Sequence, residues 1–398
     1  MFENIIGQDA VVDDLKGSLE RDELPGSLLF HGPDYSGKLS TALELARGLT
    51  CRGAHKAVWG CTCSSCKSHR TLNQPYTIMV GGRYFQDEIE ASAATFLRSP
   101  QPACRYLFIR SVRKLIRRFD PVFWDDKDAT VKKVQSALAD LDERLNKLNP
   151  EKELPSEAVL KKEVDKIVQL AGTVSAVRAV DNISIDQIRR LSVWAHGTSD
   201  SRKIIILENA DRMLESARNA LLKILEEPPP MTTFILLTGR KGGIIPTILS
   251  RVRQYSFIER TSHVSMDILK RIFREESGEY DSLRDFFLAW NINLESIRKG
   301  AGIFLEGLEG REPLNRTNLD SLFGKGKDNK KIFRVFLQEI QAFLGRRFTP
   351  EELFSDPSRG KQLAAWNDLF REALVGAEIY NQNPSLLAEG LYYKMRGI

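Results

Sequence analysis

The chain contains 398 residues, of which 42% are hydrophobic and 28% are charged, and its net charge is +5. This length exceeds what one core supports, so two or three domains are expected. The mild charge excludes a protein that binds nucleic acid over its whole surface and allows at most a local basic face. Because the sequence shows no signal peptide and no apolar run that could cross a membrane, we expect a cytoplasmic protein without membrane contact.

A phosphate-binding loop is predicted near the N-terminus. Residues 11–20 have a helical pattern, residues 28–30 form a short apolar strand, and GPDYSGK at 32–38 matches GxxxxGK before a helical segment at 39–49. Such a loop points backbone N–H groups at a phosphate, and its lysine reaches the phosphate oxygens. The candidate nucleotide-binding residues are Gly32, Ser36, Gly37, Lys38 and Leu39. Whether nucleotide is bound stays open, because the loop could persist only as a scaffold.

One position of this loop departs from the pattern that hydrolysis requires. The residue after the lysine normally carries a hydroxyl that binds Mg²⁺, and here it is Leu39. One metal ligand is therefore missing.

Four of the five cysteines are clustered. They are Cys51, Cys61, Cys63 and Cys66, whereas Cys104 stands apart. In a reducing compartment, clustered thiols bind metal more often than they form disulfides, and four thiolates close a tetrahedral structural zinc site. The spacing between the second and third cysteines is one residue, which strains a knuckle, so a metal-free loop of reduced thiols is the alternative.

Residues 95–180 are predicted to form a helical insertion. Apolar residues recur at steps of three and four from 131 to 148 and again from 160 to 174, and Asn149-Pro150 separates the two runs. We expect an antiparallel helical hairpin that projects from the α/β domain. Six basic residues precede it: Arg105, Arg110, Arg113, Lys114, Arg117 and Arg118. They could contact DNA phosphates, but a solvated helix face is the commoner explanation.

The segment from 203 to 251 has the order of an ATPase core. Residues 204–207 are a buried strand that ends at Glu208, where phosphate-bound Mg²⁺ is usually held. An amphipathic helix follows and stops at three prolines, and residues 234–238 form a second strand. Together with the phosphate loop, this order resembles the AAA+ clamp-loader family, most closely the delta-prime type of bacterial DNA polymerase III.

The resemblance implies roles for several residues. Relatives carry Asp-Glu where this chain has Glu208-Asn209, and Asn209 cannot act as a general base. Ser250-Arg251 resembles the family's Ser-Arg-Cys motif, whose arginine reaches the nucleotide site of the neighbouring subunit; a local ion pair is the alternative. Thr238 lies where relatives sense the γ-phosphate, although an ordinary strand-end threonine is equally expected.

The C-terminal part is predicted to be helical. Residues 282–285 (SLRD) resemble the lid motif whose arginine, here Arg284, contacts nucleotide; the motif comes early, so a chance match is the alternative. Residues 307–318 form a candidate linker. Amphipathic patterns at 332–343 and 363–370 precede an ending at 383–389 that resembles the clamp-loader collar.

The expected architecture is an α/β AAA+ domain with a parallel sheet over residues 1–258, carrying a zinc module at about 51–66 and the helical insertion, then an all-α lid at 259–312 and an all-α collar at 313–398. The resemblance implies a non-hydrolysing subunit that supplies Arg251 to a neighbouring ATPase in a hetero-oligomeric ring. Through that ring it would act on the sliding clamp and primed DNA. A hydrolysing gamma/tau-type subunit and an AAA+ adaptor in DNA repair are the alternatives.

Overall fold

The computed structural model describes residues 1–82, 85–124, 128–177, 183–290, 292–308, 310, 316–323, 329–348, 355–378 and 380–397. The chain divides into two compact units, Met1–Trp290 and Asn291–Ile398. This division falls inside the range 259–312 that the sequence suggested for the lid.

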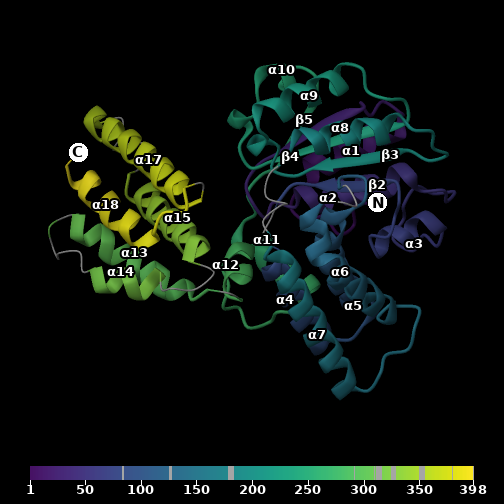
Figure 1. Ribbon diagram of the computed structural model, residues 1–398, viewed down its shortest axis with the longest axis horizontal. Coiled ribbons are helices and arrows are strands. Elements are labelled where there is room, and N and C mark those ends of the chain that lie inside the picture. The colour runs from purple at the N-terminus through teal and green to yellow at the C-terminus, as the bar shows by residue number, and fades with distance from the viewer. Residues whose placement is uncertain are drawn as a thin grey trace. The chain divides into compact units, whose positions relative to one another are not determined.

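The first unit is built on a five-stranded parallel sheet (Figure 1). Its strands are β1 (Ser27–His31), β2 (Thr77–Val80), β3 (Lys203–Leu207), β4 (Thr232–Thr238) and β5 (Arg253–Ser256), in the order β2-β3-β4-β1-β5. The three strands predicted from sequence are β1, β3 and β4, and they form the centre of the sheet. The two edge strands, β2 and β5, are short, and the sequence analysis did not predict them.

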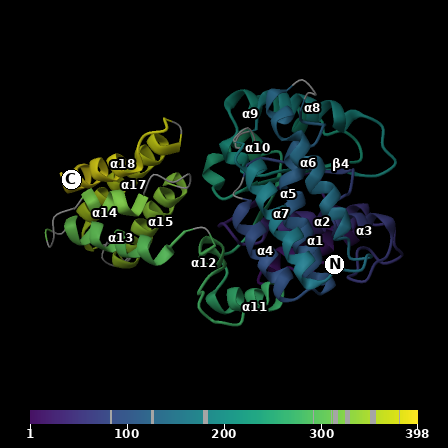
Figure 2. The same ribbon diagram turned by 60° about the horizontal axis from the view of Figure 1, so that its bottom comes forward.

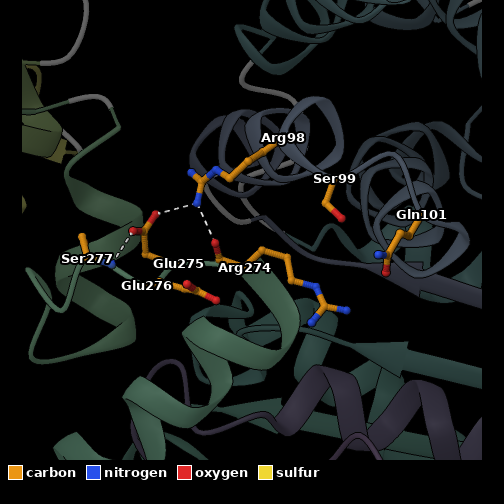
Figure 3. Close-up of a pocket in the computed structure, with 7 residues that line it drawn as sticks. All are labelled: Arg98, Ser99, Gln101, Arg274, Glu275, Glu276 and Ser277. Carbon is orange, nitrogen blue, oxygen red and sulfur yellow. Dashed lines mark hydrogen bonds and ion pairs between the residues drawn. The ribbon is translucent and has the colours of Figure 1, made fainter.

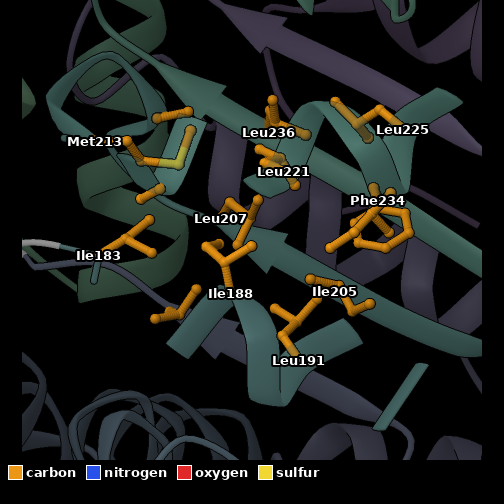
Figure 4. Packing of buried hydrophobic residues seen from close by; sticks show 14 of the residues in the cluster. Ile183, Ile188, Leu191, Ile205, Leu207, Met213, Leu221, Leu225, Phe234 and Leu236 are labelled. Carbon is orange, nitrogen blue, oxygen red and sulfur yellow. The ribbon is translucent and has the colours of Figure 1, made fainter. Parts of the chain in front are cut away.

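Helices cover both faces of the sheet. On one face lie α1 (Asp9–Glu20) and α2 (Lys38–Thr50); on the other lie α8 (Ile185–His196), α9 (Glu215–Glu226) and the short α10 (Pro246–Leu249). The strand residues alternate between these layers: Ile205 and Leu207 pack with Ile188 and Leu191 of α8, as Figure 4 shows, whereas Ile204 packs on the α1 and α2 side. Burial on both faces explains why the strands are continuously apolar.

A second group of helices packs beside the sheet. It consists of α4 (Gln86–Arg98), α5 (Pro102–Ile116), the 3₁₀ turn η1 (Arg117–Phe119), α6 (Ala129–Lys147) and α7 (Glu157–Ser175) (Figure 2). The predicted pair of helices, α6 and α7, is confirmed. They are not an isolated pair, because α4, α5, α6 and α7 share one hydrophobic core. The short helix α3 (Ser64–Arg70) follows the first cysteines.

Two further helices complete the first unit. They are α11 (Ser262–Phe273) and α12 (Leu283–Leu288), which share an aromatic core of Phe273 and Phe286 with ring centroids 5.1 Å apart. Ser282 caps α12 by accepting a hydrogen bond from the backbone N–H of Asp285, so the SLRD motif is a helix start.

The second unit contains helices and no strands among its described residues. It contains α13 (Leu294–Leu308), α14 (Arg316–Phe323), α15 (Asn329–Arg347), α17 (Pro357–Glu378) and α18 (Pro384–Arg396). The helices predicted around 332–343 and 363–370 are confirmed as parts of α15 and α17. Half of the predicted linker lies outside the described residues, and its two ends, 307–308 and 316–318, belong to α13 and α14. Asn383 caps α18, which accounts for the Asn-Pro signature. Among the described helices of the chain, none has the length and apolar composition of a membrane span.

Candidate functional site

The phosphate loop joins β1 to α2 with the predicted backbone geometry. Gly32 has φ +147° and Gly37, which precedes the first turn of α2, has φ +97°. A Cβ atom at Gly32 would lie 2.2 Å from the carbonyl oxygen of Phe257, so only glycine fits there. Leu39 packs against the apolar core on the α1 and α2 side and brings no hydroxyl to the loop.

Lys38 is turned back onto its own loop. Its Nζ atom donates to the carbonyl oxygens of Gly32 at 2.7 Å and Pro33 at 2.5 Å, and it lies 3.4 Å from the hydroxyl of the buried Ser36. Burial lowers the pKa of Lys38. A phosphate at this loop would therefore have to replace existing hydrogen bonds of the lysine.

Arg260 is a second cation on the loop, and the sequence analysis missed it. Its guanidinium donates to the carbonyl oxygens of Ile6 at 3.2 Å and Tyr35 at 2.5 Å, and it lies 2.6 Å from where a Cβ atom of Gly37 would stand. Burial lowers the pKa of Arg260 to about 10. The ring of Phe287 in α12 stacks on Tyr35 with centroids 5.5 Å apart, so the loop is covered from the α12 side.

Glu208, the candidate Mg²⁺ ligand at the end of β3, is neutralised within the chain. Its carboxylate forms an ion pair with Arg118 of η1, a residue that is 1% exposed. The Arg118 guanidinium also lies over the ring of Phe85, 5.4 Å from its centroid. A buried arginine thus stands where a divalent cation would bind the acid, and a metal would have to displace it.

Asn209, which follows β3, and Thr238, the last residue of β4, also form hydrogen bonds within the chain. Asn209 has φ +53°, and its amide donates to the carbonyl oxygen of Gly82 at 2.5 Å. The Thr238 hydroxyl donates to the carboxylate of Asp211 at 2.7 Å, and Asp211 also pairs with Arg240 at 3.1 Å. Asp211 was not singled out from the sequence.

The basic run, residues 105–118, is internal rather than a DNA-binding or solvated face, and both sequence interpretations of it are wrong. Arg105 is 6% exposed and donates to the carbonyl oxygens of Leu148, Asn149 and Lys152, with distances of 2.6 to 3.3 Å. These oxygens lie at and just beyond the C-terminus of α6, where unsatisfied carbonyls and the negative end of the helix dipole favour a cation.

Three further arginines of the basic run hold the end of α3 and the segment after it. The main-chain acceptors are His69 for Arg110, Thr71 for Arg113, and Leu72 and Gln74 for Arg117, at 2.5 to 3.0 Å. Lys114 pairs with Glu88 of α4. The positive charges therefore fasten the helices and the cysteine-bearing segment together.

Arg251 lies at the surface after α10. Its side chain is 34% exposed and pairs with Glu226 at 2.6 Å, with a further bond to the carbonyl oxygen of Thr247. Arg284 lies in α12 with its guanidinium 3.8 Å from Asp285. Arg251 thus has the local partner that the alternative interpretation expected for it, and of these two arginines only Arg251 has a side chain more than one-third exposed.

The four clustered cysteines converge on one point. Their sulfur atoms all lie within 4.8 Å of one another, and Cys51 is 3.7 Å from Cys61 and 3.9 Å from Cys63. Zinc with bonds of about 2.3 Å holds tetrahedral sulfurs about 3.8 Å apart, so the spacing fits. The thiols are free, and the backbone N–H groups of Gly53 and Ala57 point at the Cys51 sulfur. A cluster that could hold a metal ion is therefore present.

The pKa of one of the thiols, that of Cys63, also fits a cation. Burial acts to raise the pKa of Cys63, but hydrogen bonds from the Cys66 and Arg52 amides and the neighbouring thiols outweigh it and lower the pKa to about 6. Burial and the other thiols raise the pKa of Cys66. Four thiolates cannot coexist here without a positive charge among them.

Comparison with known proteins identifies the family. The sequence model of the family described as DNA polymerase III, delta subunit, matches residues 7–119 and 129–261. This chain belongs to that family. DNA polymerase III subunit delta' of Haemophilus influenzae is 33% identical over 100 residues, 25% of this chain and 31% of the relative. The delta' subunit of Pseudomonas aeruginosa is 35% identical over 99 residues, 24% of this chain and 30% of the relative.

Subunit gamma/tau of Mycoplasma genitalium is also similar, 27% identical over 160 residues, which are 39% of this chain and 27% of the relative. The matched parts thus span less than a third of each of these relatives. With the parallel sheet and the helical C-terminal unit, they make this chain a clamp-loader family member of delta-prime type with an α/β AAA+ fold.

The family match corrects one sequence interpretation. The match includes residues 95–119 and 129–180, which are most of the segment that the sequence analysis predicted to be an insertion. The four-helix group is therefore part of the region that the family shares, in keeping with its common core.

A hollow in the first unit lies apart from the predicted site residues. It has a volume of about 510 Å³, and in Figure 3 Arg98 donates there to the carbonyl oxygen of Arg274 and to Glu275. Its lining comes from the end of α4 and the segment after α11: Arg98, Ser99, Gln101, Arg274, Glu275, Glu276 and Ser277. None of the residues predicted to bind nucleotide or metal lines it.

Proposed function

We propose that this chain is a non-hydrolysing, delta-prime-like subunit of a clamp loader, and that Arg251 serves the nucleotide site of a neighbouring subunit. The observation that carries the proposal is the buried ion pair between Arg118 and Glu208. It ties up the acid that would bind Mg²⁺, while Leu39 and Asn209 remove the hydroxyl ligand and the base. The acid, the hydroxyl and the base that hydrolysis needs are therefore each occupied or missing at this one site.

The position of Arg251 supports a role in trans. Its partner Glu226 is 49% exposed, and a surface ion pair contributes only about 0–1 kcal/mol, so an incoming phosphate could replace it. The alternative of a hydrolysing gamma/tau-type subunit has the similarity to gamma/tau in its favour, but it requires Glu208 to leave Arg118.

Two assays test the proposal. The purified chain should show no Mg²⁺-dependent ATPase activity. Any background rate should be the same in the Lys38→Ala variant. In a ring reconstituted with its sister subunits, Arg251→Ala should abolish the turnover of the one site that it serves, since an arginine finger contributes about 10³–10⁵ in rate. Arg253→Ala, which removes a neighbouring surface ion pair with Asp14, is the matched control. Vigorous ATPase of the isolated chain would favour the gamma/tau alternative instead.

We further propose that the cysteine cluster holds one structural zinc ion, that residues 259–312 and 313–398 act as lid and collar, and that the protein works in the cytoplasm on the sliding clamp and primed DNA through its ring. The sulfur spacing and the lowered pKa of Cys63 support zinc. Metal analysis should find about one zinc per chain, and Cys61→Ser should release it. Well under one zinc in the intact protein would favour a loop of reduced thiols.

A further inference from the structure

The loop that carries the cysteines exposes an aromatic side chain to water. Trp59 is 64% exposed and the adjacent Val58 is 43% exposed. A single exposed apolar residue is ordinary, but a tryptophan and a valine at the tip of one loop form an apolar patch that the fold of the first unit does not use.

The backbone beneath Trp59 is held in place. Arg70 donates to the carbonyl oxygens of Trp59 at 2.5 Å and Cys61 at 2.8 Å. On the other side, the N–H of Ala57 donates to the Cys51 sulfur at 3.1 Å. The indole is therefore presented by a fixed loop, which lowers the entropy cost when a ligand stacks on it.

The charged residues of the segment that carries this loop are all basic. The sequence contains no Asp or Glu from residue 45 to residue 86, and within that stretch Arg52, Lys56, Lys67 and Arg70 surround Trp59 in the chain. Lys56 is exposed and has no ion-pair partner among the described residues. The carboxylates that approach from elsewhere, Asp200 on Arg52 and Glu151 on Lys67, form exposed pairs at 3.2 and 3.0 Å, which phosphate could replace.

We propose that the cysteine knuckle, defined as residues 51–70, binds single-stranded nucleic acid, with a base stacked on Trp59 and phosphates on Lys56 and Arg52. Aromatic faces beside exposed cations are the features by which proteins bind single strands without regard to sequence. The charged residues of the knuckle itself are all basic, and a phosphodiester chain brings one negative charge per nucleotide together with bases that stack on an indole, so this combination favours nucleic acid over a protein partner. The proposal is independent of the ATPase argument, because it concerns the isolated chain.

The test uses the full metal-loaded chain and a fluorescein-labelled oligothymidylate of about 15 nucleotides, a length of the order that such surfaces cover. Trp59→Ala should weaken binding about 5- to 100-fold, whereas Trp59→Phe should retain most of it because any aromatic face can stack. Lys56→Glu should weaken binding, and Lys56→Ala should reduce the salt slope by about 0.7, because one phosphate is no longer neutralised.

The matched control is Tyr393→Ala, which removes an aromatic ring of similar exposure, 61%, in the second unit. It should leave the affinity unchanged, and the metal content and melting temperature of all variants should equal those of the parent. The proposal is overturned if the parent chain fails to bind the oligonucleotide at low salt, or if Trp59→Ala and Lys56→Glu both bind like the parent. Loss of a sister subunit by Trp59→Ala with unchanged oligonucleotide affinity would assign the patch to a protein partner and also overturn it.

Discussion

Two groups of basic residues in the first unit differ in how far their side chains are exposed to solvent. The basic run of residues 105–118 has six positive charges in fourteen positions, yet Arg105, Arg113 and Arg118 are at most 6% exposed and bind main-chain oxygens or carboxylates. The cysteine knuckle has fewer positive charges, but Arg52 and Lys56 are exposed around Trp59.

The difference shows that charge density along a sequence does not predict surface potential. A cation is available to a ligand only when the fold gives it no better partner. In the basic run, helix ends and loop carbonyls supply those partners. In the knuckle, Lys56 has no ion-pair partner among the described residues, and Arg52 has only an exposed ion pair with Asp200.

The largest expected effect is at the buried end of the basic run. Arg118→Met should destabilise the protein by about 3–5 kcal/mol, because it removes one partner of a buried ion pair and leaves the charge of the other. The double variant Arg118→Met with Glu208→Gln should recover much of that stability, since no buried charge remains. Denaturant unfolding followed by circular dichroism measures both, and equal stability of the single and double variants would contradict the pairing.

A smaller effect is expected at the end of α6. Arg105→Ala should cost about 1–3 kcal/mol, because three carbonyl oxygens are left without their donor. Lys147→Ala, which removes an exposed pair with Glu143 in the same helix, should change the free energy of unfolding by less than about 0.5 kcal/mol. Equal losses of stability for the two substitutions would show that the hydrogen bonds of Arg105 contribute no more than an exposed ion pair.

Stability should also depend on pH through the buried His69, which lies beside the basic run. Burial, together with Arg110, Arg47 and Arg117, lowers the pKa of His69 to about 3, and its ring lies 2.8 Å from the Thr50 hydroxyl. Because the unfolded histidine titrates near its ordinary value, the unfolded state binds more protons between these pKa values. The stability gained by keeping His69 neutral is complete above the ordinary pKa of histidine. It is lost as the pH falls toward the pKa of His69 in the folded state.

At one pH unit below the ordinary pKa the decrease in stability should be about 1.4 kcal/mol. His69→Gln should lack this component, so the stability difference between parent and variant should shrink on acidification from neutral pH. Protonation of the cysteine cluster affects both proteins and cancels in the comparison. A difference that stays constant with pH would show that His69 is not held neutral.

The smallest effect on stability is expected at the knuckle. Lys56→Glu should change the free energy of unfolding by less than about 0.5 kcal/mol, because Lys56 is exposed and unpaired among the described residues. Thermal unfolding checks this, and a destabilisation as large as that of Arg105→Ala would erase the distinction between the two groups.

Several features of the site could be predicted from particular residues. The glycine positions of the phosphate loop and the apolar runs of β1, β3 and β4 are local signals, since a tight loop and a doubly buried strand each require specific residue types. The cysteine cluster could also be predicted, because thiols close together in the sequence can converge on one point without contacts from distant segments. The burial of Arg105 could have been inferred from its position one helical turn before the buried Phe108 and Ile109.

The sequence by itself determined the strand, loop and helix order, the four convergent thiols and the absence of the hydroxyl and base at Leu39 and Asn209. Only the tertiary structure decided that Arg118 neutralises Glu208, ninety positions away, and that Arg260 lies on the phosphate loop. Such pairings depend on which segments pack together, because an ion pair or a hydrogen bond to a carbonyl acts over a few ångströms in space and leaves no periodic pattern along the chain.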